Sequence, residues 1–178
     1  TDAGLVTIDA NNGKVTLKAS ADFETKASYS FNVIATDDGA GALSDTKAIT
    51  VSVNDVNDPP TFSSGGTGSI AENAATTIVA YDASASDPDT GQTITFSVSG
   101  TDAGLVDVDS DDGEIRLKSA ANFENKNSYS FNIIATDNGS TPSSKSKGIT
   151  INVTDQNDAP VATDDLAITT MNTSKNNI

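Results

Sequence analysis

The segment NDVNDPPTF, residues 54–62, joins two strand-like runs and determines how the rest of the chain is interpreted. It combines two aspartates and two asparagines with two prolines, so it is rich in oxygen ligands and restricted in backbone freedom. A variant of it, TDQNDAP, recurs one hundred positions later at 154–160. A junction that recurs at a fixed distance indicates a chain built from repeated units.

The sequence before each junction is also repeated. Residues 1–60 align with residues 101–160 without a gap, and 33 of the 60 aligned positions are identical. We therefore expect the C-terminal part of one repeat in 1–60, a complete repeat in 61–160 and the start of a third repeat in 161–178. A unit of about 100 residues has the size of a domain.

Alternating apolar residues in 61–160 predict about seven short strands with turn residues between them. The clearest runs are SFNIIAT (130–136) and GITINVT (148–154), and further strands are expected at 64–73, 76–83, 93–99, 104–109 and 114–119. The corresponding strands of the first repeat are expected at 4–9, 14–18, 29–36 and 48–54. NNG (11–13) and SDDG (110–113) are typical of hairpin turns. The pattern predicts an all-β fold, an antiparallel sandwich.

The amino-acid composition excludes several classes of function. The chain has 25 acidic and 10 basic residues, a formal net charge of −15, and no Cys, His or Trp. This balance argues against nucleic-acid binding, and the missing residue types exclude disulfides, thiolate chemistry and a Ser-His-Asp triad. No nucleophile and base can be paired, so we expect no enzyme, and no apolar run has the length of a membrane span. Oxygen is the abundant ligand atom, which suits hard cations.

Acidic and amide side chains gather in five short motifs. Each motif taken alone would indicate a solvated turn, but their fixed order and spacing favour a shared role. They are Asp22 and Glu24 in ADFE, Asp55, Asn57 and Asp58 in the junction, Glu72 in SIAEN, Asp87 and Asp89 in SDPDTG, and Asp137 in ATDNG.

These motifs resemble those of the cadherin repeat family. That family carries a D-x-N-D-x-P junction, a D-x-E pair, a glutamate near the first strand, a D-x-D loop and an A-x-D motif, and all five have counterparts here in the same order. The resemblance covers the whole chain. It implies tandem seven-stranded Greek-key sandwiches of the immunoglobulin-like type.

The resemblance also implies that Ca²⁺ binds between repeats. The implied ligands at the first junction are Asp22, Glu24, Asp55, Asn57, Asp58, Asp87, Asp89 and Asp137. A second, incomplete junction is implied at Glu72, Glu124, Asp155, Asn157 and Asp158. There the first carboxylate of the acidic pair is replaced by the amide of Asn122. Ca²⁺ takes about six to eight oxygens, and carboxylates this crowded repel one another without it.

One further acidic stretch, DVDSDDGE (107–114), resembles an EF-hand loop. Its glycine comes one position late and no glutamate follows at the twelfth position, so a hairpin turn is the better interpretation.

We expect a calcium-rigidified stalk or adhesive module of a large secreted or cell-surface protein, whose partners are neighbouring repeats of the same chain. The lack of Cys and the near-identical repeats favour a bacterial adhesin or biofilm matrix protein. The alternative is a calcium-dependent carbohydrate-binding module. Such modules stack sugars on exposed aromatic side chains, and the tyrosines are Tyr29, Tyr81 and Tyr129.

The ends of the sequence suggest a further partner. The first repeat lacks its first three strands, so we expect apolar side chains such as Leu5, Val6, Phe31, Val33 and Ile34 to be partly uncovered. The segment LAITTM (166–171) of another copy would then add to the exposed sheet edge and form a filament. The alternative is an ordinary, longer array of repeats.

Overall fold

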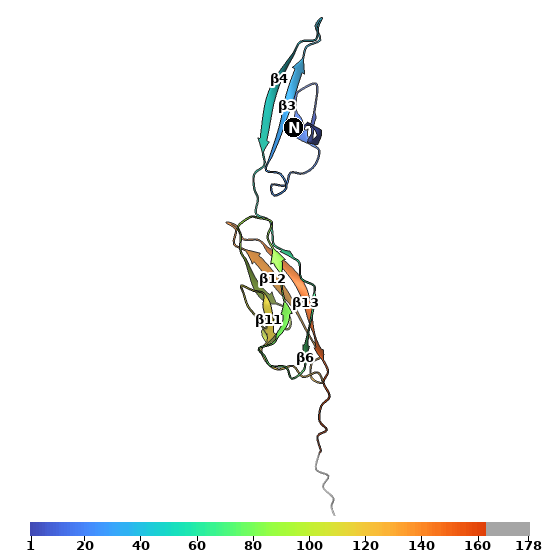
Figure 1. The fold of residues 1–178 in the computed structure, drawn as a ribbon, viewed down its shortest axis with the longest axis vertical. Helices are drawn as coiled ribbons and strands as arrows, with labels where there is room; N and C mark the ends of the chain where they lie inside the picture. Colours follow the sequence, from blue (N-terminus) through green and yellow to red (C-terminus); the bar gives the residue numbers. More distant parts are fainter. Residues whose placement is uncertain (163–178) are drawn as a thin grey trace, which may run out of the picture.

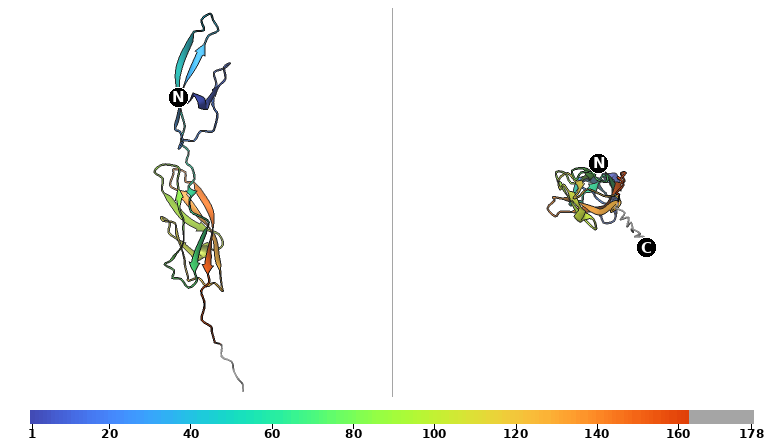
Figure 2. Two further views of the ribbon diagram at one scale, coloured as in Figure 1. Left: turned by 45° about the vertical axis from the view of Figure 1, so that its right-hand side comes forward. Right: turned by 90° about the horizontal axis from the view of Figure 1, so that it is seen from below.

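The computed structural model describes residues 1–162, which form two β-structured bodies joined end to end by a linker at 53–60 (Figure 1). The first body contains the 3₁₀ turn η1 (Ala3–Leu5) and the strands β1 (Val6–Ile8), β2 (Val15–Leu17), β3 (Ser28–Thr36) and β4 (Ser44–Ser52). Seen along the long axis, the two bodies overlie one another, so the chain is an elongated rod (Figure 2). None of the helices in residues 1–162 has the length and hydropathy needed to cross a membrane.

The second body is a sandwich of two sheets with a short strand pair at the linker end. One sheet has the order β6-β13-β12-β9, the other the order β10-β11-β7, and β5 pairs with β8. The strands are β5 (Thr61–Phe62), β6 (Thr67–Ala71), β7 (Val79–Asp82), β8 (Ala85–Ser86), β9 (Ile94–Ser99), β10 (Val106–Val108), β11 (Glu114–Leu117), β12 (Ser128–Asp137) and β13 (Ser144–Thr154), with the 3₁₀ turn η2 (Ala103–Leu105) before β10. The all-β fold and the seven predicted strands of this repeat are confirmed.

The core follows from the two-residue period of the strands. Along β12, Phe131, Ile133 and Ala135 point inward and are almost fully buried, while the residues between them are more exposed. They belong to one core cluster with Ile115 of β11 and Ile151 of β13, which have no measurable exposure. Each isoleucine buried in this way contributes roughly 1.5–3 kcal/mol relative to an exposed one.

The expectation of purely antiparallel pairing is wrong at one edge. β13 pairs with β6 in parallel, with Thr150 opposite Thr67 and Val153 opposite Ile70. The chain enters the second body at the linker end and leaves at the opposite end. Its first long strand and its last strand therefore run in the same direction. The short pair β5 and β8 was also not predicted, because runs of two residues carry no detectable period.

The first body repeats the hairpin of the second. β3 and β4 pair in the same register as β12 and β13, with Ser28 opposite Ser52 and Ser128 opposite Asn152. Of the apolar side chains expected to be partly uncovered, Leu5 and Ile34 are exposed and Val6 and Val33 are half-buried. The prediction is wrong for Phe31, which is 5% exposed and packs inside the body. The segment LAITTM (166–171) lies outside the described residues.

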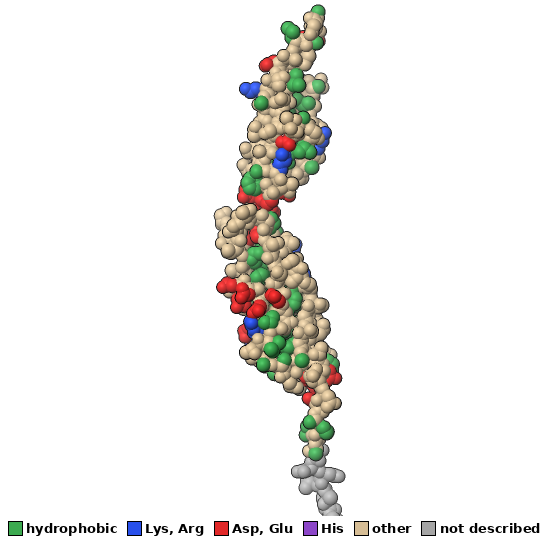
Figure 3. Space-filling view, viewed as in Figure 1, with side chains coloured by type: hydrophobic (Ala, Val, Ile, Leu, Met, Phe, Trp, Pro, Cys, Tyr) green, Lys and Arg blue, Asp and Glu red, His purple; other side chains and the backbone are tan. Residues whose placement is uncertain are grey.

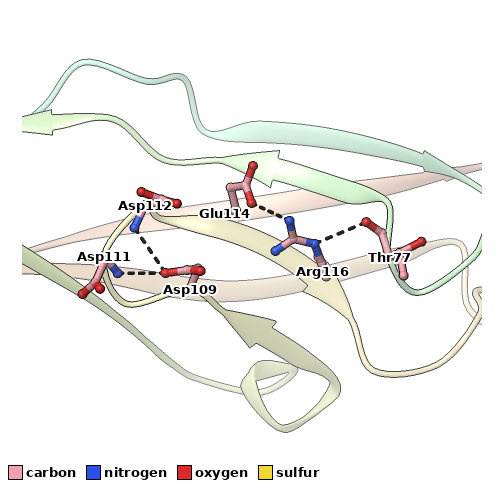
Figure 4. Close-up of polar contacts among 6 residues, drawn as sticks. All are labelled: Thr77, Asp109, Asp111, Asp112, Glu114 and Arg116. Atoms are coloured by element: carbon pink, nitrogen blue, oxygen red, sulfur yellow. Dashed lines mark hydrogen bonds and ion pairs between the residues drawn. The ribbon is translucent and has the colours of Figure 1, made fainter.

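The acidic stretch 107–114 is a hairpin turn between β10 and β11, as predicted (Figure 4). The Asp109 carboxylate accepts hydrogen bonds from the backbone N–H groups of Asp111 (3.0 Å) and Asp112 (3.3 Å), and these bonds lower its pKa. Gly113 adopts φ +77° to close the turn. Glu114 pairs with Arg116, whose Nε also donates to the Thr77 carbonyl at 3.3 Å.

The repeated TDAGLV segment has a structural role that sequence reasoning did not assign. The buried Asp102 carboxylate accepts a hydrogen bond from the Ser130 N–H (2.7 Å) and pairs with Lys126 (3.1 Å). Its counterpart Asp2 contacts the Ser30 N–H (2.8 Å) and Lys26 (3.0 Å). The hydrogen bond from Ser130 and the pairing with Lys126 hold the pKa of Asp102 below its ordinary value.

We expect Asp102→Asn to lower the free energy of unfolding by about 1–3 kcal/mol at neutral pH, because a charged acceptor is lost from a buried site. Since the pKa of Asp102 is lower in the folded chain than in the unfolded chain, this contribution is present above about pH 4. It is lost as the pH falls through the folded pKa. Urea unfolding of both proteins at pH 7 and pH 3 measures the difference.

The matched control is Asp107→Asn, because the Asp107 side chain is 71% exposed and lies 3.6 Å from Lys118. Its effect should stay within about 0.5 kcal/mol. Equal losses for the two variants, or a loss at position 102 that does not depend on pH, would contradict the assignment.

Candidate metal centre

Acidic side chains gather at the narrow neck between the two bodies (Figure 3). A hollow of about 420 Å³ opens there between the 23–24 turn of the first body, the linker and the 88–92 loop of the second. A second hollow of about 330 Å³ lies beside it and is lined by Asp22, Glu24 and Asp58, among others. The neck therefore offers polar space bordered by carboxylates from three separate segments.

Three of these carboxylates form what we call the first-junction cluster: Glu24, Asp55 and Asp89. One oxygen of each lies within 4.8 Å of the others. Glu24 is placed by a turn in which the Asp22 carboxylate accepts a hydrogen bond from the Thr25 N–H (2.9 Å). Asp55 belongs to the linker, and Asp89 lies in the loop between β8 and β9. The cluster thus brings together carboxylates of both bodies and of the linker, all three of them residues that the cadherin resemblance implied for the first junction.

The loop at 87–89 carries buried carboxylate oxygens that have no hydrogen-bond partner. Asp87 Oδ1 accepts from the Asp89 N–H (2.9 Å), and Asp89 Oδ2 accepts from the Asp58 N–H (2.8 Å). The other oxygens, Asp87 Oδ2 and Asp89 Oδ1, are buried without a hydrogen-bond partner. Within residues 1–162 one further buried side-chain oxygen, Gln92 Oε1, shares this condition, and it lies at the same junction. A buried oxygen without a hydrogen-bond donor destabilises the folded state unless a ligand binds to it.

No basic side chain offsets this cluster among the described residues. Their four ion pairs involve Asp2, Asp102, Asp107 and Glu114, and none of these belongs to the cluster. A backbone hydrogen bond of Glu24 itself lowers its pKa. Partial desolvation together with the charges of Asp55, Asp89 and Asp58 outweighs that bond and raises the pKa. The donor set of carboxylate oxygens and the uncompensated charge fit a hard divalent cation such as Ca²⁺.

Two residues of the predicted ligand set, Asn57 and Asp137, differ from the first-junction cluster because they are hydrogen-bonded to each other and to further protein groups. Asn57 Nδ2 donates to Asp137 Oδ2 at 3.0 Å, and Asn57 Oδ1 accepts from Gln92 Nε2 at 2.6 Å. Burial raises the pKa of Asp137, but hydrogen bonds from Gly139, Asn57 and Ser143 outweigh it and hold the pKa below its ordinary value. Asn57 and Asp137 therefore lie at the neck but bond to protein groups.

The second junction gathers Glu72, Glu124 and Asp155, again with oxygens within 4.8 Å of one another. Glu72 is 3% exposed and accepts from the N–H groups of Gln156 (2.6 Å) and Phe123 (3.0 Å), which lower its pKa. Asn157 and Asp158 are exposed in the strand-free segment that follows. Asn122 accepts from the Asn125 N–H (2.8 Å), the turn contact that Asp22 makes in the first repeat.

Sequence reasoning missed Gln92 and Gly139, which both contact Asn57. The comparison of repeats could not find Gln92, because residues 61–100 have no aligned counterpart in 1–60. Gly139 does have a counterpart in Gly39, but a glycine that is repeated in the sequence does not indicate which residues it contacts.

Comparisons with known proteins agree with the fold. The sequence model of the cadherin domain matches residues 67–154. The chain is 33% identical to mouse Protocadherin Fat 2 over 164 residues and 34% identical to human Protocadherin-1 over 164 residues. These matches cover 89% and 90% of this chain, but only 4% and 16% of the relatives. The chain thus spans a small part of the curated relatives it matches.

Two solved structures show the same fold. Protocadherin Gamma B2 extracellular cadherin domains 1-5 superimpose with a TM-score of 0.65 and 28% identity, over 86% of this chain and 32% of that one. Mouse Cadherin-23 EC22-24 gives a TM-score of 0.64 and 25% identity, over 86% of this chain and 50% of that one. On the fold, the junction and these matches, the chain belongs to the cadherin family.

Proposed function

We propose that the first junction binds Ca²⁺ and that the ion fixes the two bodies of the chain as one rigid segment. The observation that carries this proposal is the pair of buried, unpartnered oxygens of Asp87 and Asp89 beside the carboxylates of Glu24 and Asp55. The residues that would hold the ion are Asp22, Glu24, Asp55, Asn57, Asp58, Asp87, Asp89 and Asp137. Calcium would supply the positive charge that no lysine or arginine supplies there.

The proposed role follows from where the site lies. A cation shared by Glu24 of the first body, Asp55 of the linker and Asp89 of the second would remove the linker's freedom to bend. The solved relatives include extracellular cadherin domains of Protocadherin Gamma B2, and this chain is likewise an extracellular or cell-surface module. We propose that it is a stalk or adhesion segment of a longer, tandem array, with neighbouring repeats as its immediate partners.

In that array, residues 1–60 are the end of one repeat, residues 61–160 a complete repeat and residues 161–178 the start of the next. The second-junction cluster of Glu72, Glu124 and Asp155 would form half of a further calcium site, together with Asn157 and Asp158. A bacterial source, expected from composition, stays a prediction.

Carbohydrate binding is not favoured by any observation. The three tyrosines are 6–8% exposed, and none of the six phenylalanines is exposed. No aromatic side chain is therefore fully presented for a sugar ring to stack on. The family relationship to cadherins likewise supports a structural and adhesive role in preference to a catalytic one.

Calcium should stabilise the folded chain. A ligand that binds only the native state adds about 2.7 kcal/mol when its concentration is a hundred times Kd. We expect the melting midpoint in millimolar calcium to exceed that in EDTA, with little effect of magnesium, which prefers tight octahedral geometry. Equal midpoints in calcium and EDTA would refute the proposal.

Calcium affinity should depend on the 87–89 loop and not on the hairpin turn. Asp89→Ala removes a cluster carboxylate and should weaken binding on the order of tenfold or more. Asp112→Ala, in the exposed turn at 110–113, should leave affinity unchanged. Isothermal titration of both variants tests the placement, and comparable losses would show that the site has been misplaced.

The rod should also lose its fixed shape without calcium. A short linker held by a shared cation keeps one angle between the bodies, whereas a free linker samples many. Small-angle scattering of the chain in calcium and in EDTA should give a broader distance distribution in EDTA. A profile that is indifferent to EDTA would contradict the stalk role, even if calcium binds.

A further inference from the structure

The side chain of Gln92 carries a buried amide oxygen that the protein leaves without a partner. Gln92 lies in the loop between β8 and β9 and lines the hollow of about 420 Å³ at the neck, together with Glu24 and Asp89. Within residues 1–162, three buried side-chain oxygens have no hydrogen-bond partner: Asp87 Oδ2, Asp89 Oδ1 and Gln92 Oε1. Two of the three belong to carboxylates of the proposed calcium site, and the third lies at the same junction.

The orientation of the Gln92 amide follows from a chain of hydrogen bonds that starts at a carboxylate. Asp137 accepts only, so the Asn57 group that faces Asp137 Oδ2 at 3.0 Å is the donor Nδ2. Asn57 Oδ1 then accepts from Gln92 Nε2 at 2.6 Å, which identifies the other end of the Gln92 amide as its oxygen. These bonds leave further lone pairs on the oxygens of Asn57 and Asp137, so both can still bind the cation.

The backbone keeps space free around this oxygen. A Cβ atom built on Gly139 would overlap Asn57 Oδ1 and lie 3.0 Å from Gln92 Oε1. A Cβ built on the counterpart Gly39 would meet only the side chain of Asp37, at 3.3 Å. The two amide oxygens of Asn57 and Gln92 therefore lie together beside Gly139, in a space that a side chain at position 139 would fill.

We infer that Gln92 Oε1 is a neutral oxygen ligand of the cation at the first junction. This inference rests on the proposed calcium site, and it adds to that site a ligand that the cadherin resemblance does not imply. Ca²⁺ accepts amide carbonyl oxygens as well as carboxylates. An amide adds an oxygen to the coordination shell without adding charge to a neck where Glu24, Asp55 and Asp89 already stand close together.

The inference is tested by exchanging the functional groups of Gln92. Gln92→Met has a similar length but offers neither the amide oxygen nor the amide N–H. Gln92→Glu keeps an oxygen and removes only the donor to Asn57. If Gln92 Oε1 binds the cation, isothermal titration should show calcium affinity weakened about tenfold or more in Gln92→Met. Affinity should be retained or increased in Gln92→Glu, because a carboxylate oxygen also binds Ca²⁺ and adds negative charge to the site.

Equal losses of affinity in the two variants would overturn the inference, because Gln92 would then act only as a positioning residue, through its bond to Asn57. Unchanged affinity in Gln92→Met would overturn it as well, while leaving the calcium proposal intact. If the parent chain binds no calcium, both proposals fall. The matched control for charge is Asn132→Asp, which should bind calcium as the parent does. Asn132 is exposed on β12 and lines neither hollow at the neck.

A readout in the parent chain covers the case in which a variant does not fold. Coordination of Gln92 Oε1 withdraws electron density from the side-chain carbonyl carbon. In ¹³C-labelled chain, the resonance of that carbon should therefore move downfield when calcium is added to the EDTA-treated chain. The side-chain carbonyl of Asn132 is the internal control and should not move. A Gln92 resonance that stays in place while calcium binds would overturn the inference.

Discussion

The position of the linker depends on its hydrogen bonds to the second body, among them the bond from the backbone N–H of Asp58 to Asp89 Oδ2 at 2.8 Å. That bond holds the linker against the 87–89 loop, and the buried ring of Pro60 fixes the chain two residues further on. With the linker docked there, Asp55 lies beside Asp89, and Glu24 of the first body completes the cluster. Carboxylates this close repel one another and destabilise the folded state unless a cation compensates their charge. The docking of the linker therefore creates a site that a cation would stabilise.

Much of this architecture could be predicted from sequence, because it rests on periodic or repeated signals. The two-residue alternation of apolar residues indicated the strands β12 and β13, and the offset of one hundred positions indicated that the chain repeats itself. The acidic motifs come from segments far apart in the chain, and it was the cadherin resemblance that implied the meeting of Glu24, Asp55 and Asp89. The turn at 110–113 was also predictable, since Asp109 and Gly113 are suited to closing a hairpin.

Other features of the structure could not be predicted from the sequence pattern. The division of the acidic residues into those satisfied by protein and those without donors depends on where Gln92 and the 139–143 loop lie in space. Asp37 and Asp137 occupy equivalent positions, yet only Asp137 meets a linker asparagine. Phe31 was expected to be partly uncovered, but it is 5% exposed, and nothing in the sequence pattern indicated this burial. β6 pairs in parallel with β13 because the chain enters the second body at one end and leaves it at the other. This is a property of the whole topology and not of either strand's sequence.

That parallel pair has a mechanical consequence. The linker enters at one end of the second body and the chain leaves at the other, so tension along the rod acts parallel to β6 and β13. Their hydrogen bonds, which join Thr67–Ala71 to Thr150–Thr154, lie across the direction of pull. Force then shears these bonds together instead of opening them one by one from an end. The topology that makes the chain a rod therefore also makes it resistant to extension, because all the hydrogen bonds between β6 and β13 must break together.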